Sequence, residues 1–452
     1  MRTKNPTHIR IFKVGAVVAS IAMLMTACAS AEQAKGKQSG GDAEYYKAAV
    51  AEAKAIADGK DLNKSLEMVG LNSGGDGQAL QELYKAFTEG TGVSVKYTGA
   101  PDVNNIVQSR LQAGNPPDVA DLSLGIGLSY AKDGDTIDLS DAFGDELNEN
   151  FSEEALENTS VDGKVFGIYQ GFNNFMLWYN PETYSGPESP TSWEQIKDWT
   201  TEQADEGNPV WCAAQNAGAQ SGFPGAQFLE NIFLKKYGPE LYREWGEGGL
   251  PWTSPEVKDA FEEFGAMIGT DDNVAGGVSG ILSTQIATGY NGLTSDPASC
   301  QAILWGAWVP GYLGDTVRPG ENLDFYRVPA TNEEFADYEL FQSSASVGFT
   351  DNDTTKAFLQ FISSTPAQTY LASLGRWPVA NKNVASDAYP TTILKKISDE
   401  YFGSSGTKPA IGPNALADPE TQNAYWKGVV TYLQNPSQLD DVLKTIQAAS
   451  EE

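Results

Sequence analysis

Histidine is almost absent from this chain of 452 residues, because His8 is the only one. It lies near the N-terminus, in a segment that has the features of a secretion signal. We therefore expect the mature protein to contain no histidine. This excludes Ser-His-Asp and Cys-His nucleophile pairs, histidine-based acid or base catalysis and histidine-containing zinc sites. Hydrolysis by paired carboxylates stays open, since it requires no histidine.

Basic residues are also scarce, with 30 Lys and Arg against 60 Asp and Glu and a formal net charge of −30. The first 27 residues hold four basic and no acidic side chains, so their removal makes the net charge still more negative. A chain of this charge repels nucleic acid and anionic lipid. We interpret the acidity as a source of solubility outside the cell rather than as an acidic binding function.

A long apolar run is missing as well. The most apolar stretch, Val14–Met25, is shorter than the roughly 20 residues that cross a bilayer. It follows four basic residues and leads into Leu24-Met25-Thr26-Ala27-Cys28, which resembles the end of a lipoprotein signal peptide. Residues 1–27 are therefore predicted to be a signal peptide and Cys28 the lipidated N-terminus. The alternative is an ordinary secreted protein in which Cys28 only lies near the cleavage site.

Only two further cysteines are present, Cys212 and Cys300. Disulfides persist in the compartments that exported proteins enter. We therefore predict that these two residues pair, which in the chain-entropy model contributes about 4 to 5 kcal/mol for a loop of this length. Two separately buried thiols are the alternative.

The order of polar and apolar residues indicates where the folded part begins. Residues 28–42 are small and polar and are predicted to form a flexible tether, followed by a peripheral helix over 43–57. A strand is predicted at 66–71. It is followed by a predicted helix, in which Leu80, Leu83, Tyr84 and Phe87 share one face, and by a predicted strand at 93–97. Because such units recur, we expect an α/β fold with largely parallel sheets.

The glycine-rich loop at residues 72–77 does not match a nucleotide-binding motif. It has neither a Gly-Lys-Ser/Thr ending nor a Gly-x-Gly-x-x-Gly register. Its backbone amides and Asp76 suit a neutral, hydroxyl-rich ligand instead. An Asp-x-Asp-x-Asp-Gly loop with a distal Glu is not found either, and we expect no metal and no cofactor.

Several motifs occur in an order typical of one protein family. They are Phe87-Thr88-Glu89-Gly90-Thr91-Gly92-Val93, Gly114-Asn115-Pro116-Pro117-Asp118-Val119, Asp162-Gly163-Lys164-Val165-Phe166-Gly167, Leu177-Trp178-Tyr179-Asn180 and Pro190-Thr191-Ser192-Trp193-Glu194. With this order from about residue 66 onward, the chain resembles the family 1 extracellular solute-binding proteins of carbohydrate ABC transporters, which include maltose-binding proteins. The resemblance implies binding and not catalysis.

The same resemblance implies a two-lobed, type II periplasmic-binding-protein-like α/β fold that closes over its ligand by hinge motion. The chain would cross between the lobes three times, near residues 173, 318 and 376. Lobe 1 would then comprise residues 43–173 and 318–376, and lobe 2 residues 174–317 and 377–452.

Three stretches resemble the α-glucoside-binding branch more closely, in which paired cysteines also occur. They are Trp211-Cys212 with Ser221-Gly222-Phe223-Pro224, Leu250-Pro251-Trp252-Thr253-Ser254-Pro255, and Cys300 ahead of Trp305. Ser221 and Phe223 stand where that branch more often has Thr and Trp. The expected ligand is an α-linked oligosaccharide of the α-glucoside type, with an α-galactoside or another oligosaccharide as the alternative.

A sugar site needs carboxylates and amides for the hydroxyl groups and aromatic rings for the flat C–H faces. Residues with these side chains lie in the glycine-rich loop, at predicted strand ends, near the crossings and in the motifs of the resemblance. The predicted ligand-binding residues are Asp76, Asp121, Tyr169, Phe172, Asn173, Gln220, Phe223, Trp305, Trp308, Arg376 and Trp377. For any single tryptophan, packing in the core is the competing interpretation.

Two other functions compete with sugar capture. A carboxylate-based glycoside hydrolase needs no histidine, and a cell-surface adhesin or structural lipoprotein would carry the same anchor. The tether, the anchor and the family order of motifs favour capture. We therefore expect a monomeric lipoprotein on the outer face of the cell membrane, with an oligosaccharide ligand and the permease subunits of an ABC importer as partners.

Overall fold

A computed structural model describes residues 41–451 except residues 101, 315–316 and 403–405. From Gly41 onward the described chain forms one compact unit. The predicted signal peptide, Cys28 and the tether up to residue 40 lie outside the described residues. Within the described ranges, none of the helices has the length and apolar character that a membrane span requires.

The first of two five-stranded sheets has the order β2-β1-β3-β11-β6. Its strands are β1 (Ser65–Gly70), β2 (Ser94–Gly99), β3 (Val119–Ser123), β6 (Gly167–Ile168) and β11 (Ser344–Gly348). Strands β1, β2 and β3 are parallel, whereas β11 runs antiparallel to β3 and β6. A small hairpin of β4 (Ser160–Val161) and β5 (Lys164–Val165) lies outside the sheet.

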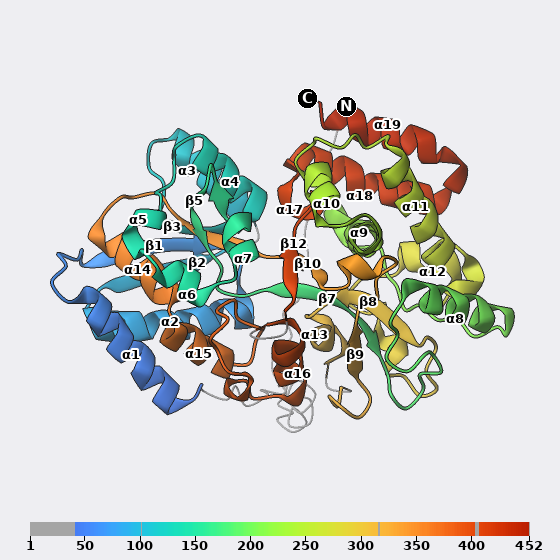
Figure 1. The fold of residues 1–452 in the computed structure, drawn as a ribbon, viewed down its shortest axis with the longest axis horizontal. Coiled ribbons are helices and arrows are strands. Elements are labelled where there is room, and N and C mark those ends of the chain that lie inside the picture. Colours follow the sequence, from blue (N-terminus) through green and yellow to red (C-terminus); the bar gives the residue numbers. More distant parts are fainter. Residues whose placement is uncertain (1–40, 101, 315–316, 403–405, 452) are drawn as a thin grey trace, which may run out of the picture. The chain divides into compact units, whose positions relative to one another are not determined.

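Helices from two separate parts of the chain surround this sheet, as the blue and brown ribbons in Figure 1 show. They are α1 (Ala43–Ala57), α2 (Gly74–Thr91), α3 (Val103–Gln112), α4 (Leu124–Lys132), α5 (Ser140–Phe143), α6 (Glu146–Asn150), α7 (Glu153–Asn158), α14 (Asp353–Ser363) and α15 (Thr365–Ser373). Helix α1 packs against α2, α14 and α15, so the ends of this lobe's two segments share one core.

The predicted strand, helix and strand at the start of the fold are confirmed as β1, α2 and β2. Leu80, Leu83, Tyr84 and Phe87 are buried on one face of α2, and the helix ends at Gly92 in the left-handed conformation, with φ of 78°. The glycine-rich loop is shorter than expected, because α2 already begins at Gly74.

The second sheet has β12-β10-β7-β8 as its path, with β9 also pairing with β7. Its strands are β7 (Asn173–Tyr179), β8 (Ala302–Gly306), β9 (Asp324–Arg327), β10 (Tyr338–Gln342) and β12 (Lys408–Ala410). The expectation of largely parallel sheets is wrong here, since β7 is antiparallel to β8, β9 and β10. Strands β7 and β10 carry the chain between the lobes in opposite directions, which requires them to be antiparallel.

The second lobe holds the remaining helices. They are α8 (Trp193–Asp205), α9 (Phe223–Tyr237), α10 (Pro239–Gly246), α11 (Pro255–Ile268), α12 (Gly277–Ser283), α13 (Val309–Leu313), α16 (Thr392–Tyr401), α17 (Pro413–Leu416), α18 (Pro419–Gln434) and α19 (Leu439–Ala449). Short 3-10 turns link several of them. The predicted disulfide between Cys212 and Cys300 is present, with the two Cα atoms 5.3 Å apart.

The chain passes between the two sheets at positions that differ in part from those predicted. The first passage lies between β6 and Asn173, next to the predicted position. The crossing predicted near residue 318 is wrong, because β9 and β10 still belong to the second sheet and the chain returns at Ser343. The third passage follows Asn383, whose side chain still bonds to Glu149 of α6, and so comes later than residue 376.

Candidate ligand-binding site

A cavity of about 510 Å³ lies between the two lobes and is lined by residues of both. The first lobe contributes the carboxyl ends of β1 and β3 and the start of α2 and α4. The second lobe contributes the end of β8, the following turn, and residues of α9, α13 and α17. Eight of the predicted ligand-binding residues line this cavity: Asp76, Asp121, Asn173, Phe223, Trp305, Trp308, Arg376 and Trp377.

Two of the segments that join the lobes contribute to the cavity wall. Gln170 and Gly171 come from the first passage, and Gln342, Ser343 and Ser344 from the second. The two passages are tied together, because the Ser343 hydroxyl donates a hydrogen bond of 2.5 Å to the carbonyl oxygen of Gly171. This part of the site therefore sits on the segments that join the two lobes.

Asp121 lies in the middle of β3 with its side chain almost fully buried. Ser344 donates a hydrogen bond of 2.8 Å to one carboxylate oxygen and Ser346 one of 3.3 Å to the other. Burial raises the pKa of Asp121 to about 6, although the two serine hydroxyls act in the opposite direction. At neutral pH this carboxylate is an acceptor at the cavity wall.

Asp76 and Arg376 form an ion pair at the cavity wall. Nε and Nη2 of Arg376 lie 2.7 Å and 2.6 Å from the same oxygen, Oδ1 of Asp76, and both side chains are 44% exposed. The second carboxylate oxygen and Nη1 of the guanidinium have no partner within the described residues. The pair thus places a hydrogen-bond acceptor next to a donor, which suits neighbouring hydroxyl groups of one ligand.

Aromatic side chains form the second-lobe wall. Trp305 donates from Nε1 to Oε1 of Gln227 at 2.6 Å and stacks on Tyr290, with the ring centroids 4.6 Å apart. Trp308 stands nearly perpendicular to Trp305, with an interplanar angle of 88° and a centroid distance of 5.4 Å. Tyr312 packs against Trp305 at 5.1 Å. The wall is therefore a fixed set of rings rather than a single mobile one.

Trp377 and Phe223 add aromatic surface from other directions. The ring of Trp377 lies directly against Gly171, where a Cβ atom would overlap its indole. Phe223 is the first residue of α9 and packs edge-on against Trp426, with centroids 5.9 Å apart. Only glycine at position 171 allows the indole of Trp377 to approach the backbone this closely.

Three predicted residues do not line the cavity. Tyr169 and Phe172 are buried and pack on each other, with ring centroids 4.8 Å apart, and Phe172 also stacks on Phe402. Gln220 lies exposed in the 3-10 turn Gly218–Gln220. In the motif at the first passage, Gln170 and Gly171 face the cavity, whereas the two aromatic residues that flank them, Tyr169 and Phe172, face the core.

Several lining residues are not among the predicted ligand-binding residues. The most polar ones are Asn72, Ser123, Gln342, Ser343, Ser344 and Asn414. Residues 342–344 were missed because the second passage was placed near residue 318. Asn414 lies in the short helix α17, for which no periodic pattern exists. Asn72 was within the glycine-rich loop that was singled out, so a signal for it was present.

The lining combines aromatic rings, amides, hydroxyls, one ion pair and one further carboxylate. Such a wall makes both donor and acceptor hydrogen bonds to a ligand with many hydroxyl groups, and its rings cover the apolar faces of that ligand. Arg376 is the only Lys or Arg among the described residues of the lining, and it is already paired with Asp76. The site therefore suits a neutral ligand.

Curated relatives match most of the chain. Residues 82–393 match the family model described as bacterial extracellular solute-binding protein. The osmoprotective compounds-binding protein GgtB of a Synechocystis species is 25% identical over 388 residues, which are 83% of this chain and 90% of that protein. The alpha-glucosides-binding periplasmic protein AglE of Rhizobium meliloti is 26% identical over 84% of this chain and 86% of that protein.

Solved structures of two solute receptors have the same fold. AcbH, described as preferring β-D-galactopyranose exclusively, gives a TM-score of 0.73 at 18% identity, covering 86% of this chain and 98% of that one. RafE from Streptococcus pneumoniae gives 0.67 at 15% identity, with 86% and 98% covered. The family model spans well over half of the residues and agrees with this fold. The chain therefore belongs to the bacterial extracellular solute-binding protein family.

Proposed function

We propose that this protein captures an α-linked oligosaccharide of the α-glucoside type in the cavity between its lobes and delivers it to an ABC importer. The observation that carries the proposal is the lining itself. Fixed aromatic rings on one lobe face the Asp76–Arg376 pair and the buried carboxylate of Asp121 on the other. This combination provides stacking surfaces and hydrogen-bonding groups for a neutral sugar.

The choice of an α-glucoside is supported by the relatives rather than by the cavity alone. AglE is named as an α-glucosides-binding protein and aligns with most of this chain. An α-galactoside is the second candidate, because RafE, whose structure has been solved in complex with raffinose, shares the fold. Lipidation of Cys28, a tether over residues 28–42 and a monomeric state complete the proposal, which places the protein on the outer face of the cell membrane.

Hydrolysis of the sugar is a less suitable function for this cavity. Among the described residues of the lining the only carboxylates are Asp76 and Asp121, and both come from the first lobe. A two-carboxylate glycosidase places its acid and its base or nucleophile on either side of the scissile bond. Both oxygens of Asp121 are also engaged by serine hydroxyls.

Calorimetric titration tests the proposal. The chain from Gly41 onward, which forms a compact unit by itself, is titrated with α-gluco- and α-galacto-oligosaccharides, glucose and a β-linked control. We expect one saturating site for an α-linked sugar that is recovered intact. Trp308→Ala should weaken binding at least about tenfold, since a hot-spot aromatic contributes more than about 1.4 kcal/mol.

Tyr45→Ala provides the matched control, because this partly exposed aromatic residue of α1 does not line the cavity. Its affinity should equal that of the unmodified chain. No heat with any sugar of the panel, or recovery of cleaved sugar, would contradict the proposal. Saturation by an α-galactoside alone would replace the first candidate by the second.

A further inference from the structure

The two lobes touch at one flank of the cavity, where the start of α4 meets α17. Ser123 and Leu124 line the cavity from the first lobe, and Asn414 and Ala415 from the second. At Gly125, a Cβ atom would lie 2.7 Å from the carbonyl oxygen of Ala415 and 3.0 Å from that of Leu416. Both atoms belong to the backbone of α17, which cannot turn aside as a flexible side chain can.

Helix α17 is held firmly within the second lobe. Asn414 donates from its backbone N and from Nδ2 to Oε1 of the buried Glu230, at 3.2 Å and 2.6 Å. Its own Oδ1 accepts a hydrogen bond of 2.7 Å from the indole of Trp426. Gly412, which precedes α17, packs closely on Gly246 of α10. A Cβ atom at position 246 would lie 2.7 Å from the carbonyl carbon of Gly412. The position that α17 presents to α4 is therefore fixed.

The partial charges of the backbone groups of α4 and α17 that meet here are of opposite sign. The first turn of a helix carries a partial positive charge, and Gly125 lies in the first turn of α4. The carbonyl oxygens of Ala415 and Leu416, which are partially negative, lie against it. Glycine is also the poorest helix former apart from proline, so the close approach gives a physical reason for glycine at this position.

We propose that the contact of Gly125 with Ala415 and Leu416 of α17 is a latch. Through this latch the two lobes complete their closure over the ligand. The inference rests on the proposed function. A side chain at position 125 would hold α4 and α17 apart. Leu124, which precedes Gly125, and Ala415, which is part of the contact, both line the cavity. This separation would therefore leave the cavity wall open and reduce the population of the closed, binding-competent state.

Two substitutions of increasing size test the latch, each with a control on the same helix. Gly125→Ala and Gly125→Leu introduce the side chain. Gly127→Ala is the matched control for alanine, because only a side-chain atom, Cγ1 of Val347, lies within 4 Å of its Cβ position, at 3.4 Å. Ser129→Leu is the control for leucine, since Ser129 is exposed on α4. None of these three positions, 125, 127 and 129, belongs to the proposed sugar contacts.

Affinity for the sugar found in the titration is the first readout. We expect Gly125→Ala to weaken it about fivefold and Gly125→Leu more than about twentyfold, because the apparent dissociation constant rises as the competent fraction falls. Both controls should stay within about twofold. The melting temperature of Gly125→Ala should be unchanged or higher, since alanine favours the helix. Equal affinities of Gly125→Leu and the unmodified chain would overturn the latch.

Small-angle X-ray scattering is the second readout and separates the latch from the proposed function. In saturating sugar, Gly125→Leu should keep a larger radius of gyration than the unmodified chain and Ser129→Leu. Loss of affinity without this difference would overturn the latch. If the unmodified chain binds none of the sugars, the proposed function fails. The latch is then decided by the ligand-free chains, where equal radii for Gly125→Leu and the unmodified chain would overturn it.

Discussion

Glu230 carries its carboxyl group in the interior of the second lobe. It accepts a hydrogen bond of 2.6 Å from the Tyr242 hydroxyl and two from Asn414, and the hydroxyl of Tyr425 is also near. Burial raises its pKa from an ordinary value of 4.5 to about 8, although these hydrogen bonds oppose the change. No basic group is among the neighbours that influence it.

This shift predicts a pH-dependent stability. Between pH 4.5 and pH 8 the folded protein keeps a proton on Glu230 that the unfolded chain has lost, so the free energy of unfolding falls as the pH rises through this range. The decrease amounts to at most about 5 kcal/mol. Glu230→Gln should flatten the profile above pH 6, which urea unfolding at pH 5, 6.5 and 8 measures.

Asp121 also contributes to the pH dependence of stability, in the unmodified chain and in Glu230→Gln alike. Its pKa is raised to about 6, so it adds a decrease of the same sign at lower pH that remains in Glu230→Gln. Parallel profiles of the two proteins between pH 6.5 and 8 would show that Glu230 is ionised in the folded state at neutral pH.

Arg376 provides a prediction about affinity at the same scale. Arg376→Lys keeps a positive charge near Asp76 but removes the planar fork, so we expect sugar affinity to fall about ten- to a hundredfold, the loss of one or two hydrogen bonds to a charged group. The side chain is 44% exposed, so stability should change by less than about 0.5 kcal/mol. Calorimetry and thermal unfolding measure the two effects.

Arg318→Lys is the control for that exchange. Arg318 is 52% exposed and pairs with Glu321 at 2.8 Å, but it does not line the cavity. Its substitution should leave sugar affinity unchanged. A loss of affinity in Arg318→Lys equal to that in Arg376→Lys would remove the specific role of the Asp76–Arg376 pair.

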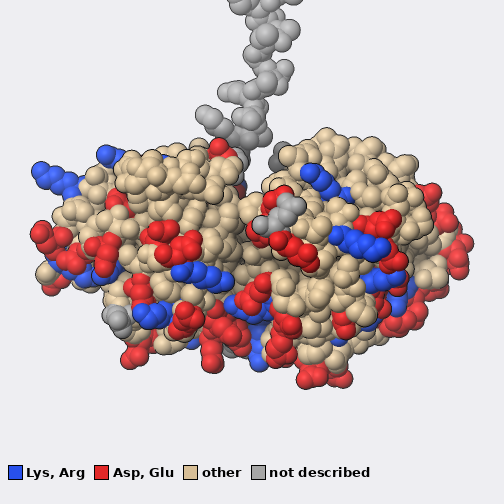
Figure 2. Space-filling view, turned by 90° about the horizontal axis from the view of Figure 1, so that it is seen from above, with Lys and Arg blue, Asp and Glu red and all other residues tan. Residues whose placement is uncertain are grey.

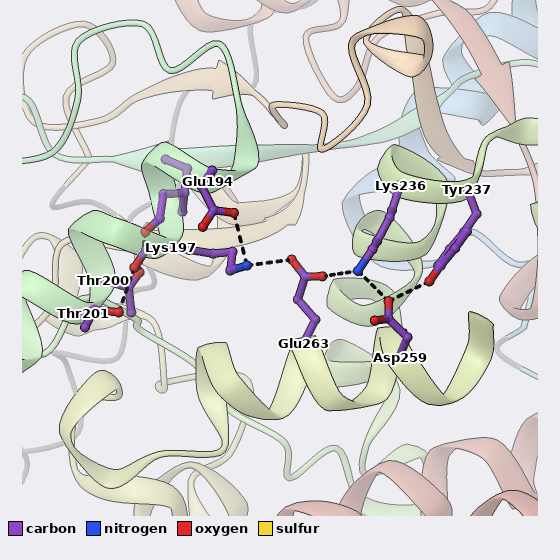
Figure 3. Close-up of polar contacts among 9 residues, drawn as sticks. Glu194, Lys197, Thr200, Thr201, Lys236, Tyr237, Asp259 and Glu263 are labelled. Carbon is purple, nitrogen blue, oxygen red and sulfur yellow. Dashed lines mark hydrogen bonds and ion pairs between the residues drawn. The ribbon is translucent and has the colours of Figure 1, made fainter. Parts of the chain in front are cut away.

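At the scale of elements, three helices of the second lobe are joined by a chain of charges (Figure 3). Lys236 of α9 lies 2.5 Å from Asp259 and 3.0 Å from Glu263, both on α11. Glu263 reaches on toward Lys197 of α8 at 3.9 Å. Burial alone would lower the pKa of Lys236, but its hydrogen bonds to the two carboxylates raise it.

Lys236→Met should therefore destabilise the fold by about 1 to 2 kcal/mol, because the 9% exposed Glu263 would lose its nearest cation. Lys47→Met is the matched control. Lys47 pairs with Glu44 on α1 with both side chains more than two thirds exposed, and its loss should cost less than about 0.5 kcal/mol. Equal effects of the two substitutions on chemical denaturation would contradict the structural role of the network.

The elements that the sequence predicted well are those with a strong local pattern. The helix over 43–57 follows from its alanine-rich composition, and the unit of β1, α2 and β2 follows from the local pattern of apolar residues. Strand β7 has the burial of a core strand on both faces, so its direction relative to β8 and β10 leaves no trace in the sequence. The prediction of site residues met a similar difficulty. The rings of Tyr169 and Phe172 are as suitable for packing in the core as for stacking on a sugar, and the sequence does not distinguish the two.

At the scale of the whole molecule, acidic residues outnumber basic ones. Figure 2 shows Asp and Glu spread over both halves of the face in view, with fewer Lys and Arg between them. The sequence holds 60 acidic and 30 basic residues. This charge acts on any ion that approaches the cleft, whereas a neutral sugar experiences no such force.

The affinity for the proposed ligand should therefore be nearly independent of salt. We expect the dissociation constant of an uncharged oligosaccharide to change less than about twofold between 20 mM and 500 mM NaCl, since screening acts only between charges. A uronic acid derivative of the same sugar should bind more weakly and improve with salt. A strong salt dependence for the neutral sugar would indicate that the true ligand is charged.

The crossing positions are the part of the whole fold that sequence reasoning placed least well. The first passage falls at a motif, Gln170-Gly171-Phe172-Asn173, whereas the second is a single residue, Ser343, between two ordinary strands. A turn of one residue has no composition of its own. It takes its position from the pairing of β10 with β7 and of β11 with β3, which are contacts far apart in the sequence.

The described chain starts on one lobe and ends on the other. Asp42 donates from its backbone N to the hydroxyl of Ser373, the last residue of α15, while α19 packs on α18 and α11 of the second lobe. A donor fluorophore fused before Gly41 and an acceptor fused after Glu451 would each move with a different lobe. The protein thus already has the layout of a genetically encoded sugar sensor, in which energy transfer between the two ends would report occupancy.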